Sequence, residues 1–135
     1  MKGQHQKGAA AIEFALILPA LILLLFGTLE VSLLLFNEQV ITNAGREGAR
    51  YGIVFKAPRY TDAEIRAVVI AYCTGHLITF GAAGDPGIVI GRTGTGSSFG
   101  DDLTVTVTYN YDFLVLANFG FGPVTLTAKT VMKSE

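Results

Sequence analysis

The sequence has one cysteine, two histidines and few charged residues, and each scarcity excludes a class of protein. Cys73 has no second cysteine to pair with, so an internal disulfide is excluded. We expect it to be a small buried residue on an apolar helix face, with an intermolecular bridge as the alternative. The net charge of −1 gives no electrostatic basis for binding nucleic acid. His5 and His76 are isolated in the sequence, so no metal site is expected.

The sequence also lacks a recognisable catalytic or cofactor pattern. No nucleophile, base and orienting group are spaced to indicate catalysis, so we do not expect an enzyme. The glycine-rich run at residues 94–100 misses the nucleotide-binding fingerprint by one position and has no following helix, so it is interpreted as a strand connector. Asp101 and Asp102 lack the ligand spacing of a known calcium loop, and weak calcium binding there is the less favoured alternative.

The chain does contain one long apolar run, which is free of charge from Phe14 to Leu29. Roughly 20 apolar helical residues cross a bilayer core of about 30 Å, and Ala9 to Leu29 meets that requirement. The apolar character continues to Phe36, which leaves about 12 Å of helix to be covered by the protein's own domain or by another copy. Pro19 is expected to bend this helix rather than end it.

Charged residues near the two ends of the run predict its orientation. Lys2 and Lys7 precede it, so the N-terminus is expected in the cytoplasm and the residues after Phe36 outside. A removable secretory signal is disfavoured, because such signals have cores of only ~7–15 apolar residues. The predicted organisation is a leader at 1–8, a transmembrane helix at 9–36 and an extracytoplasmic domain at 37–135. Glu30 is expected to face water near the outer membrane surface.

The helix is predicted to continue beyond the membrane to about Phe55. Ala44, Gly48 and Gly52 recur every four residues and form a smooth face, which allows another backbone to approach closely. We expect that face to pack on the protein's own sheet, with another subunit as the alternative. Arg46, Glu47 and Arg50 project elsewhere, either as a solvated helix face or as a contact with a partner.

The remaining residues predict a small α+β domain. Thr61 and Glu64 form a capping box for a second helix that ends at 75–77. Alternation with period two predicts antiparallel strands, three or four in all, that pack one face on the first helix. The expected strands cover residues 87–92, 103–111 and 124–132, with a turn region at 118–123.

The N-terminal half is similar to a known family over residues 7–54. The residues that carry the resemblance are Lys7-Gly8-Ala9-Ala10-Ala11-Ile12-Glu13-Phe14 with Pro19, then Thr42-Asn43-Ala44, then Arg46-Glu47-Gly48-Ala49-Arg50. They resemble the TadE-like family, the minor pilins (pseudopilins) of the tight-adherence (Tad/Flp, type IVc) pilus system. The C-terminal strands match that family in style only, and the chain's size fits the TadE and the TadF type equally.

The resemblance implies a pilin-like fold and a role in pilus assembly, with links to adhesion and secretion. It implies that a prepilin peptidase cuts between Gly8 and Ala9, and that Glu13 then pairs with the free α-amino group of Ala9 in a neighbouring subunit. The implied partners are membrane lipid, other pilin and pseudopilin subunits, the peptidase and the pilus assembly platform. The implied location is the bacterial inner membrane, with one membrane pass, or the pilus itself, and no cofactor is implied.

A different class of function also fits the residues. A bitopic protein with the same anchor would hold its outer domain at the membrane to bind a partner or a secreted substrate, without entering a filament. Peptidase-dependent processing and the effect of Glu13→Ala distinguish the two interpretations.

Overall fold

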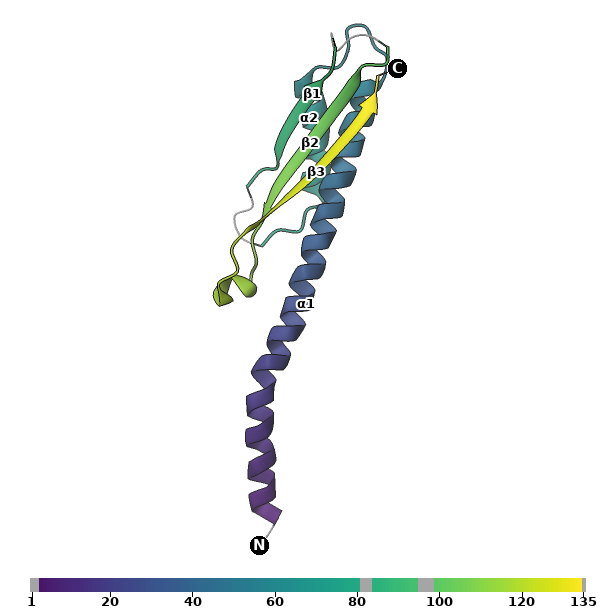
Figure 1. The fold of residues 1–135 in the computed structure, drawn as a ribbon. Helices are drawn as coiled ribbons and strands as arrows, with labels where there is room; N and C mark the ends of the chain where they lie inside the picture. Colours follow the sequence, from purple (N-terminus) through teal and green to yellow (C-terminus); the bar gives the residue numbers. More distant parts are fainter. Residues whose placement is uncertain (1–2, 81–83, 95–98, 135) are drawn as a thin grey trace.

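The computed structural model describes residues 3–80, 84–94 and 99–134, and its longest element is the helix α1, Gly3–Ile53. At about 1.5 Å per residue, its 51 residues extend about 75 Å. Pro19 lies inside the helix without ending it, as expected. α1 ends two residues before the predicted Phe55, ahead of the Lys56-Ala57-Pro58 segment. Figure 1 shows its N-terminal half extending alone beyond the rest of the fold.

The second helix, α2, covers Asp62–His76 and begins with the predicted capping box. The Glu64 backbone N–H donates to the Thr61 hydroxyl, and the Thr61 backbone N–H donates to the Glu64 carboxylate. Ile65, Val69 and Cys73 recur every four residues and are the buried residues of α2. The apolar face predicted for this helix is therefore its packing face, and it lies against α1.

Three strands form one antiparallel sheet in the order β1-β2-β3. They are β1 at Gly87–Arg92, β2 at Asp102–Tyr111 and β3 at Val124–Lys133. The register pairs Ile90 with Val105 on one side of β2 and Val107 with Ala128 on the other. The strand bounds differ from the predicted ones by one residue at most, and the fold is the expected α+β class with a three-stranded sheet.

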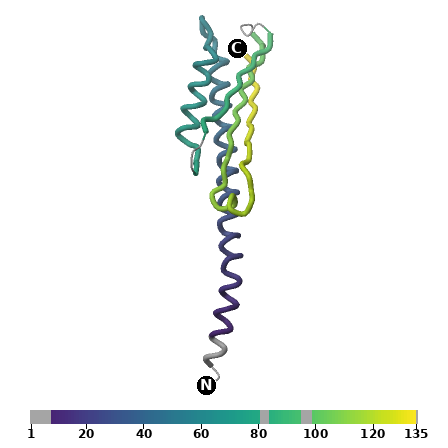
Figure 2. Tube along the Cα trace, turned by 90° about the vertical axis from the view of Figure 1, so that its left-hand side faces the viewer, coloured from purple at the N-terminus to yellow at the C-terminus, as the bar shows by residue number. Residues whose placement is uncertain are grey.

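The two helices cover one face of the sheet. α1 packs on β2 and β3, while α2 packs on α1 and touches β1. Figure 2 shows this arrangement from the side, with both helices on the same side of the sheet over the upper half of the molecule. The core lies between the layers and includes Ile41, Ile65, Val69, Val105 and Val107. The second half of α1 is thus part of the domain, and the first half is not.

The connection between β2 and β3, residues 112–123, is more ordered than the turn that the sequence predicts. It contains a 3₁₀ helix, η1, at Leu116–Phe119, which ends at Gly120 with a φ of 89°. Such a φ suits glycine because it has no Cβ. η1 contacts α1, so this loop lies against the long helix on the side of the domain that faces the N-terminus (Figure 1).

Candidate assembly and packing sites on the first helix

Residues 8–22 of α1 form an apolar surface on which nothing in the described part of the chain packs. Every side chain from Gly8 to Ile22 is exposed, including Ile12, Phe14, Leu16 and Ile17. Among the residues that the structure describes, α1 is the one helix long and apolar enough to cross a membrane. A helix that buries none of this surface in its own fold needs lipid or other helices around it. α1 therefore has the length and the exposed apolar surface of a single-pass membrane anchor.

Gly8, Ala9 and Glu13 lie at the start of this surface, within one helical stretch.

 The backbone is helical through all three positions, and Ala9 and Glu13 are exposed one turn apart on the same face of α1. A Cβ added at Gly8 would meet no heavy atom within 4 Å, so the Gly8–Ala9 bond is not shielded by the domain. No hydrogen bond or ion pair joins the Glu13 carboxylate to the side chains described from residue 8 onward. Any charge partner for Glu13 at this depth must come from outside that part of the chain.

Glu30 does not lie in water as we predicted; it is buried, with 4% of its surface exposed. Its carboxylate accepts three consecutive backbone N–H groups of the β2–β3 loop. Those of Leu114 and Val115 lie 2.5 Å from Oε1, and that of Leu116 lies 2.9 Å from Oε2. Successive backbone N–H groups form a concave site for an anion, and here the anion is a side chain of the same protein. The prediction failed because these donors lie 84 to 86 residues away in the sequence.

Asn37 is a second buried polar residue that sequence reasoning missed. Its side-chain amide donates to the Ile78 carbonyl over 2.7 Å and accepts the Ile78 N–H over 3.0 Å, so both of its polar ends are paired. Asn37 follows Glu30 by seven residues and precedes buried Ala44 by seven, which places all three on one face of α1. The seven-residue spacing of Glu30 and Asn37, on a helix that is otherwise largely apolar, was the sequence signal that could have indicated their burial. Through these hydrogen bonds, Asn37 holds the segment after α2 against α1, and Glu30 holds the segment after β2 against the same helix.

The small residues of α1 provide close packing against the rest of the domain. A Cβ at Gly48 would lie 2.4 Å from Val69 Cγ2, and a Cβ at Gly52 would lie 2.5 Å from Leu103 Cδ2 and 2.6 Å from Ile65 Cδ1. We expected the sheet as the neighbour, but for Gly48 the neighbour is α2. Gly52 meets both layers, because Leu103 belongs to β2 and Ile65 to α2. Gly45 also faces the sheet, 3.2 Å from Thr130 Oγ1 by the same measure. Ala44 is fully buried in the core.

Arg46, Glu47 and Arg50 lie on the other side of the helix, away from the core. Arg50 donates to both oxygens of the Glu47 carboxylate, over 2.7 Å and 3.2 Å, and Arg46 donates to Asn43 Oδ1 over 3.4 Å. The hydrogen bond from Arg50 lowers the pKa of Glu47, and the same bond raises the pKa of Arg50. With most of the Arg50 side chain exposed, this pair contributes little to stability. It places a positive and a negative charge side by side on the surface.

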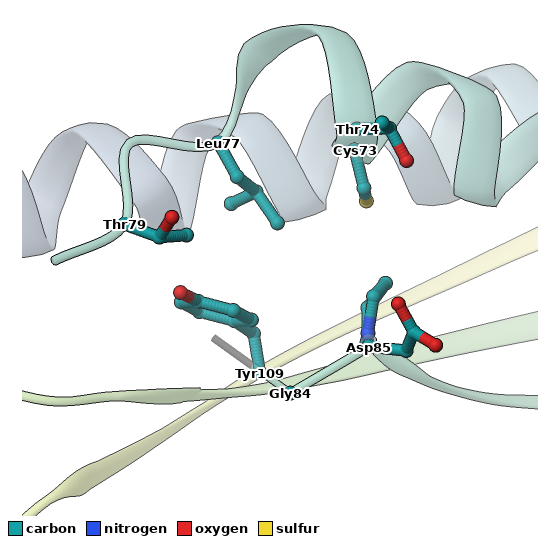
Figure 3. A pocket seen from close by; sticks show the side chains of 8 residues that line it. Cys73, Thr74, Leu77, Thr79, Gly84, Asp85 and Tyr109 are labelled. Carbon is teal, nitrogen blue, oxygen red and sulfur yellow. The ribbon is translucent and has the colours of Figure 1, made fainter. Parts of the chain in front are cut away.

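A pocket beside Cys73 offers no catalytic arrangement. Figure 3 shows Cys73 and Leu77 of α2 on one side of the space, with Tyr109 of β2 and Asp85 on the other. Burial raises the pKa of the Cys73 thiol to about 11, so the thiol is protonated and a poor nucleophile at neutral pH. Cys73 is fully buried, as the sequence predicted.

The other side chains considered as metal ligands have other partners or lie apart from one another. Asp102 Oδ1 lies 2.8 Å from Lys133 Nζ, in an ion pair between neighbouring strands. The ring of His76 stacks on Tyr72 with a centroid distance of 4.4 Å. The residues with described positions contain no group of three or more His, Cys, Asp or Glu side chains that suits a metal ion. The side chain of His5 lies outside the described residues.

Comparison with known proteins matches the N-terminal part of the chain to a family. The family model of the TadE-like protein covers residues 8–50. This range includes the exposed apolar surface, Glu13, Glu30, Asn37 and the charged group from Arg46 to Arg50. No curated protein and no solved structure matches the chain.

Proposed function

We propose that the protein is a non-catalytic minor pilin, or pseudopilin, of a Tad/Flp-type pilus, because residues 8–50 match the family model of the TadE-like protein. In this proposal a prepilin peptidase removes residues 1–8, and the subunit then joins other pilin subunits through the exposed half of α1. The N-terminus faces the cytoplasm and the domain lies outside the inner membrane. The assembly platform and the neighbouring subunits are its partners.

The observation that carries the proposal is Glu13, which has no charge partner among the side chains described from residue 8 onward and lies on a helix surface that is otherwise apolar and uncovered. A carboxylate at the centre of a bilayer costs about 2.5–3.5 kcal/mol on insertion scales, and Glu13, about 6 Å inside a span that begins at Ala9, carries a smaller part of that cost. That cost favours any arrangement that supplies a positive charge at the same depth. Cleavage before Ala9 creates such a charge, because the new α-amino group of one subunit lies close to the level of Glu13 in the next. A buried polar pair of this kind also sets the axial register between helices.

The rest of the fold is consistent with a subunit that holds its domain rigidly at the end of a membrane helix. α1 runs without a break from the exposed half into the core, where Ile41, Ala44 and Ala49 are fully buried. Glu30 and Asn37 add fixed polar contacts at the point where the helix enters the domain. Helices packed side by side in a filament therefore set the position of every domain. A flexible linker, as in a simple tethered protein, would leave the domains free to move.

Substitution of Glu13 tests the proposal directly. Glu13→Ala removes the carboxylate without adding a charge to the apolar surface, so membrane insertion is retained. We expect the variant to reach the membrane at the normal level and to be recovered in sheared filaments, or cross-linked to other pilins, at least about tenfold less than wild type.

The matched control is Glu38→Ala, which removes a carboxylate from the same helix within the domain. This variant should assemble normally. Normal assembly of Glu13→Ala would contradict the pilin proposal and favour an anchored protein that binds a partner without entering a filament. Loss of Glu13→Ala from the membrane fraction would contradict the role assigned to this carboxylate.

A further inference from the structure

The β2–β3 loop, residues 112–123, exposes large apolar side chains although it belongs to the extramembrane domain. Leu114, Phe119 and Phe121 are 57%, 60% and 57% exposed. No charged residue occurs from Phe113 to Pro123. Apolar side chains gathered on one exposed loop mark a surface that contacts something other than water.

Contacts with α1 place this loop at a defined height along the helix. A Cβ added at Gly27 would lie 3.9 Å from Leu116 Cδ2, and Glu30 binds the backbone of Leu114, Val115 and Leu116. A membrane span that begins at Ala9 ends near Leu29, because about 20 residues cross a bilayer core of about 30 Å. The loop therefore lies beside the last turn of the span. In Figure 1 it is the part of the domain that extends furthest toward the N-terminal half of α1.

The backbone of the loop is also suited to an environment with little water. In lipid, N–H groups without partners cost several kcal/mol each, so they need partners within the protein. The Glu30 carboxylate accepts three of them. The N–H groups of Asn118, Gly120 and Phe121 donate to carbonyls at Val115, Ala117 and Leu116. The loop thus presents apolar side chains while most of its backbone donors are already satisfied.

An apolar groove between the loop and the helix adds a second feature of the same kind. The residues that line it include Phe26, Leu29 and Leu33 of α1, Leu114 of the loop and Phe80, together with Glu30. The groove is continuous with the membrane-spanning surface of α1, because Phe26 and Leu29 belong to both. An acyl chain beside the helix is the occupant that this continuity favours.

We propose that the β2–β3 loop inserts Leu114, Phe119 and Phe121 into the outer interface of the membrane and is a second lipid contact besides α1. Glu30 is then the residue that fixes the loop to the helix at this depth. Two membrane contacts, α1 and the loop, hold the domain at a set height and tilt. With α1 as the single contact, the molecule would be free to tilt and to rotate about the helix axis. This proposal depends on membrane anchoring by α1, and the experiment below separates the failure of one from the failure of the other.

A tryptophan introduced by substitution tests the proposal, because the chain has none of its own. Three single variants of the full chain are reconstituted in phosphatidylcholine–phosphatidylglycerol vesicles, with and without bromine on the acyl chains. Phe119→Trp reports on the loop. Phe26→Trp reports on the membrane span. Phe99→Trp reports on the far end of the domain, since Phe99 is 86% exposed and precedes the opposite end of β2.

We expect the Phe119→Trp variant to show blue-shifted emission, strong quenching by brominated lipid and weak quenching by iodide, as the Phe26→Trp variant does. The Phe99→Trp variant should show the reverse. If Phe26→Trp is quenched by brominated lipid and Phe119→Trp is not, the loop proposal is wrong and the anchor stands. If neither is quenched, membrane anchoring fails as well. Blue-shifted emission from Phe119→Trp without lipid quenching would show that the loop packs on a second copy, which also overturns the lipid contact.

Discussion

Glu30 joins two parts of the chain that are more than 80 residues apart in the sequence. Its carboxylate is buried, yet three backbone N–H groups pair with it, and Tyr111 lies close enough for its hydroxyl to reach the Glu30 carbonyl over 3.5 Å. A buried carboxylate without such partners would carry a large desolvation cost. The single charge in the outer part of the apolar run is therefore a structural residue.

Replacing Glu30 by glutamine tests this role. The amide keeps one acceptor oxygen, but its nitrogen is a donor and faces a loop N–H, and the charge is lost. Hydrogen bonds to charged groups contribute about 1.5–3 kcal/mol, so Glu30→Gln should lower the melting temperature of the domain by about 10 °C. The measurement is tyrosine near-ultraviolet circular dichroism of the full chain in detergent micelles.

Glu38→Gln is the control for this substitution. Glu38 lies two turns further along α1, and its carboxylate makes no hydrogen bond to the residues that the structure describes. The Glu38→Gln variant should have the melting temperature of the wild-type protein. Equal melting temperatures for Glu30→Gln and Glu38→Gln would contradict the structural role of Glu30.

Single residues were predictable where their neighbours in the sequence decide their surroundings. The burial of Cys73 followed from its position on an apolar helix face, and the pairing of Thr61 with Glu64 followed from a spacing of three residues. Glu30 and Asn37 were not predictable in this way. Their partners, Leu114 and Ile78, come from loops whose path depends on the whole fold.

At the scale of elements, close packing between α1 and α2 depends on Gly48. The position leaves no room for a side chain, because an added Cβ would lie 2.4 Å from Val69 Cγ2. Val69 is fully buried, and a β-branched side chain has few alternative rotamers in a helix. The glycine therefore sets the distance between the two helices.

Gly48→Leu should destabilise the domain by about 2 kcal/mol, because added atoms in a packed core force side chains and backbone to shift. Gly75→Leu is the matched control. It lies in α2, where an added Cβ would meet nothing within 4 Å, and leucine favours a helix more than glycine does. Chemical unfolding followed by circular dichroism compares the two. A Gly48→Leu chain as stable as Gly75→Leu would show that the helices do not pack as described.

The helices and strands themselves were predictable because local sequence signals mark where each one begins and ends. The Lys56-Ala57-Pro58 segment predicted the end of the first helix to within two residues, and a capping box predicted the start of the second. Alternation with period two predicted strands within one residue of those observed. Which surface each small residue of α1 packs against was less predictable. Small residues indicate close approach to some surface, and Gly48 approaches α2 whereas Gly45 approaches the sheet.

The whole molecule has two parts on one continuous helix. The first part exposes an apolar surface and belongs in lipid or against other helices, and the second is built into the domain from Glu30 onward. Leu35 and Phe36 remain exposed beyond the span, so the domain covers only one side of the extra apolar length. The charged group of Arg46, Glu47 and Arg50 also faces outward and stays a proposed contact for a partner.

The central claim is that the chain is processed so that its first helix can assemble with others. Intact-mass and N-terminal analysis of the protein, taken from membranes and from sheared filaments of a host that has the peptidase, tests it most directly. The account predicts a mature chain that begins at Ala9 in both fractions. A chain that keeps its first eight residues would contradict it.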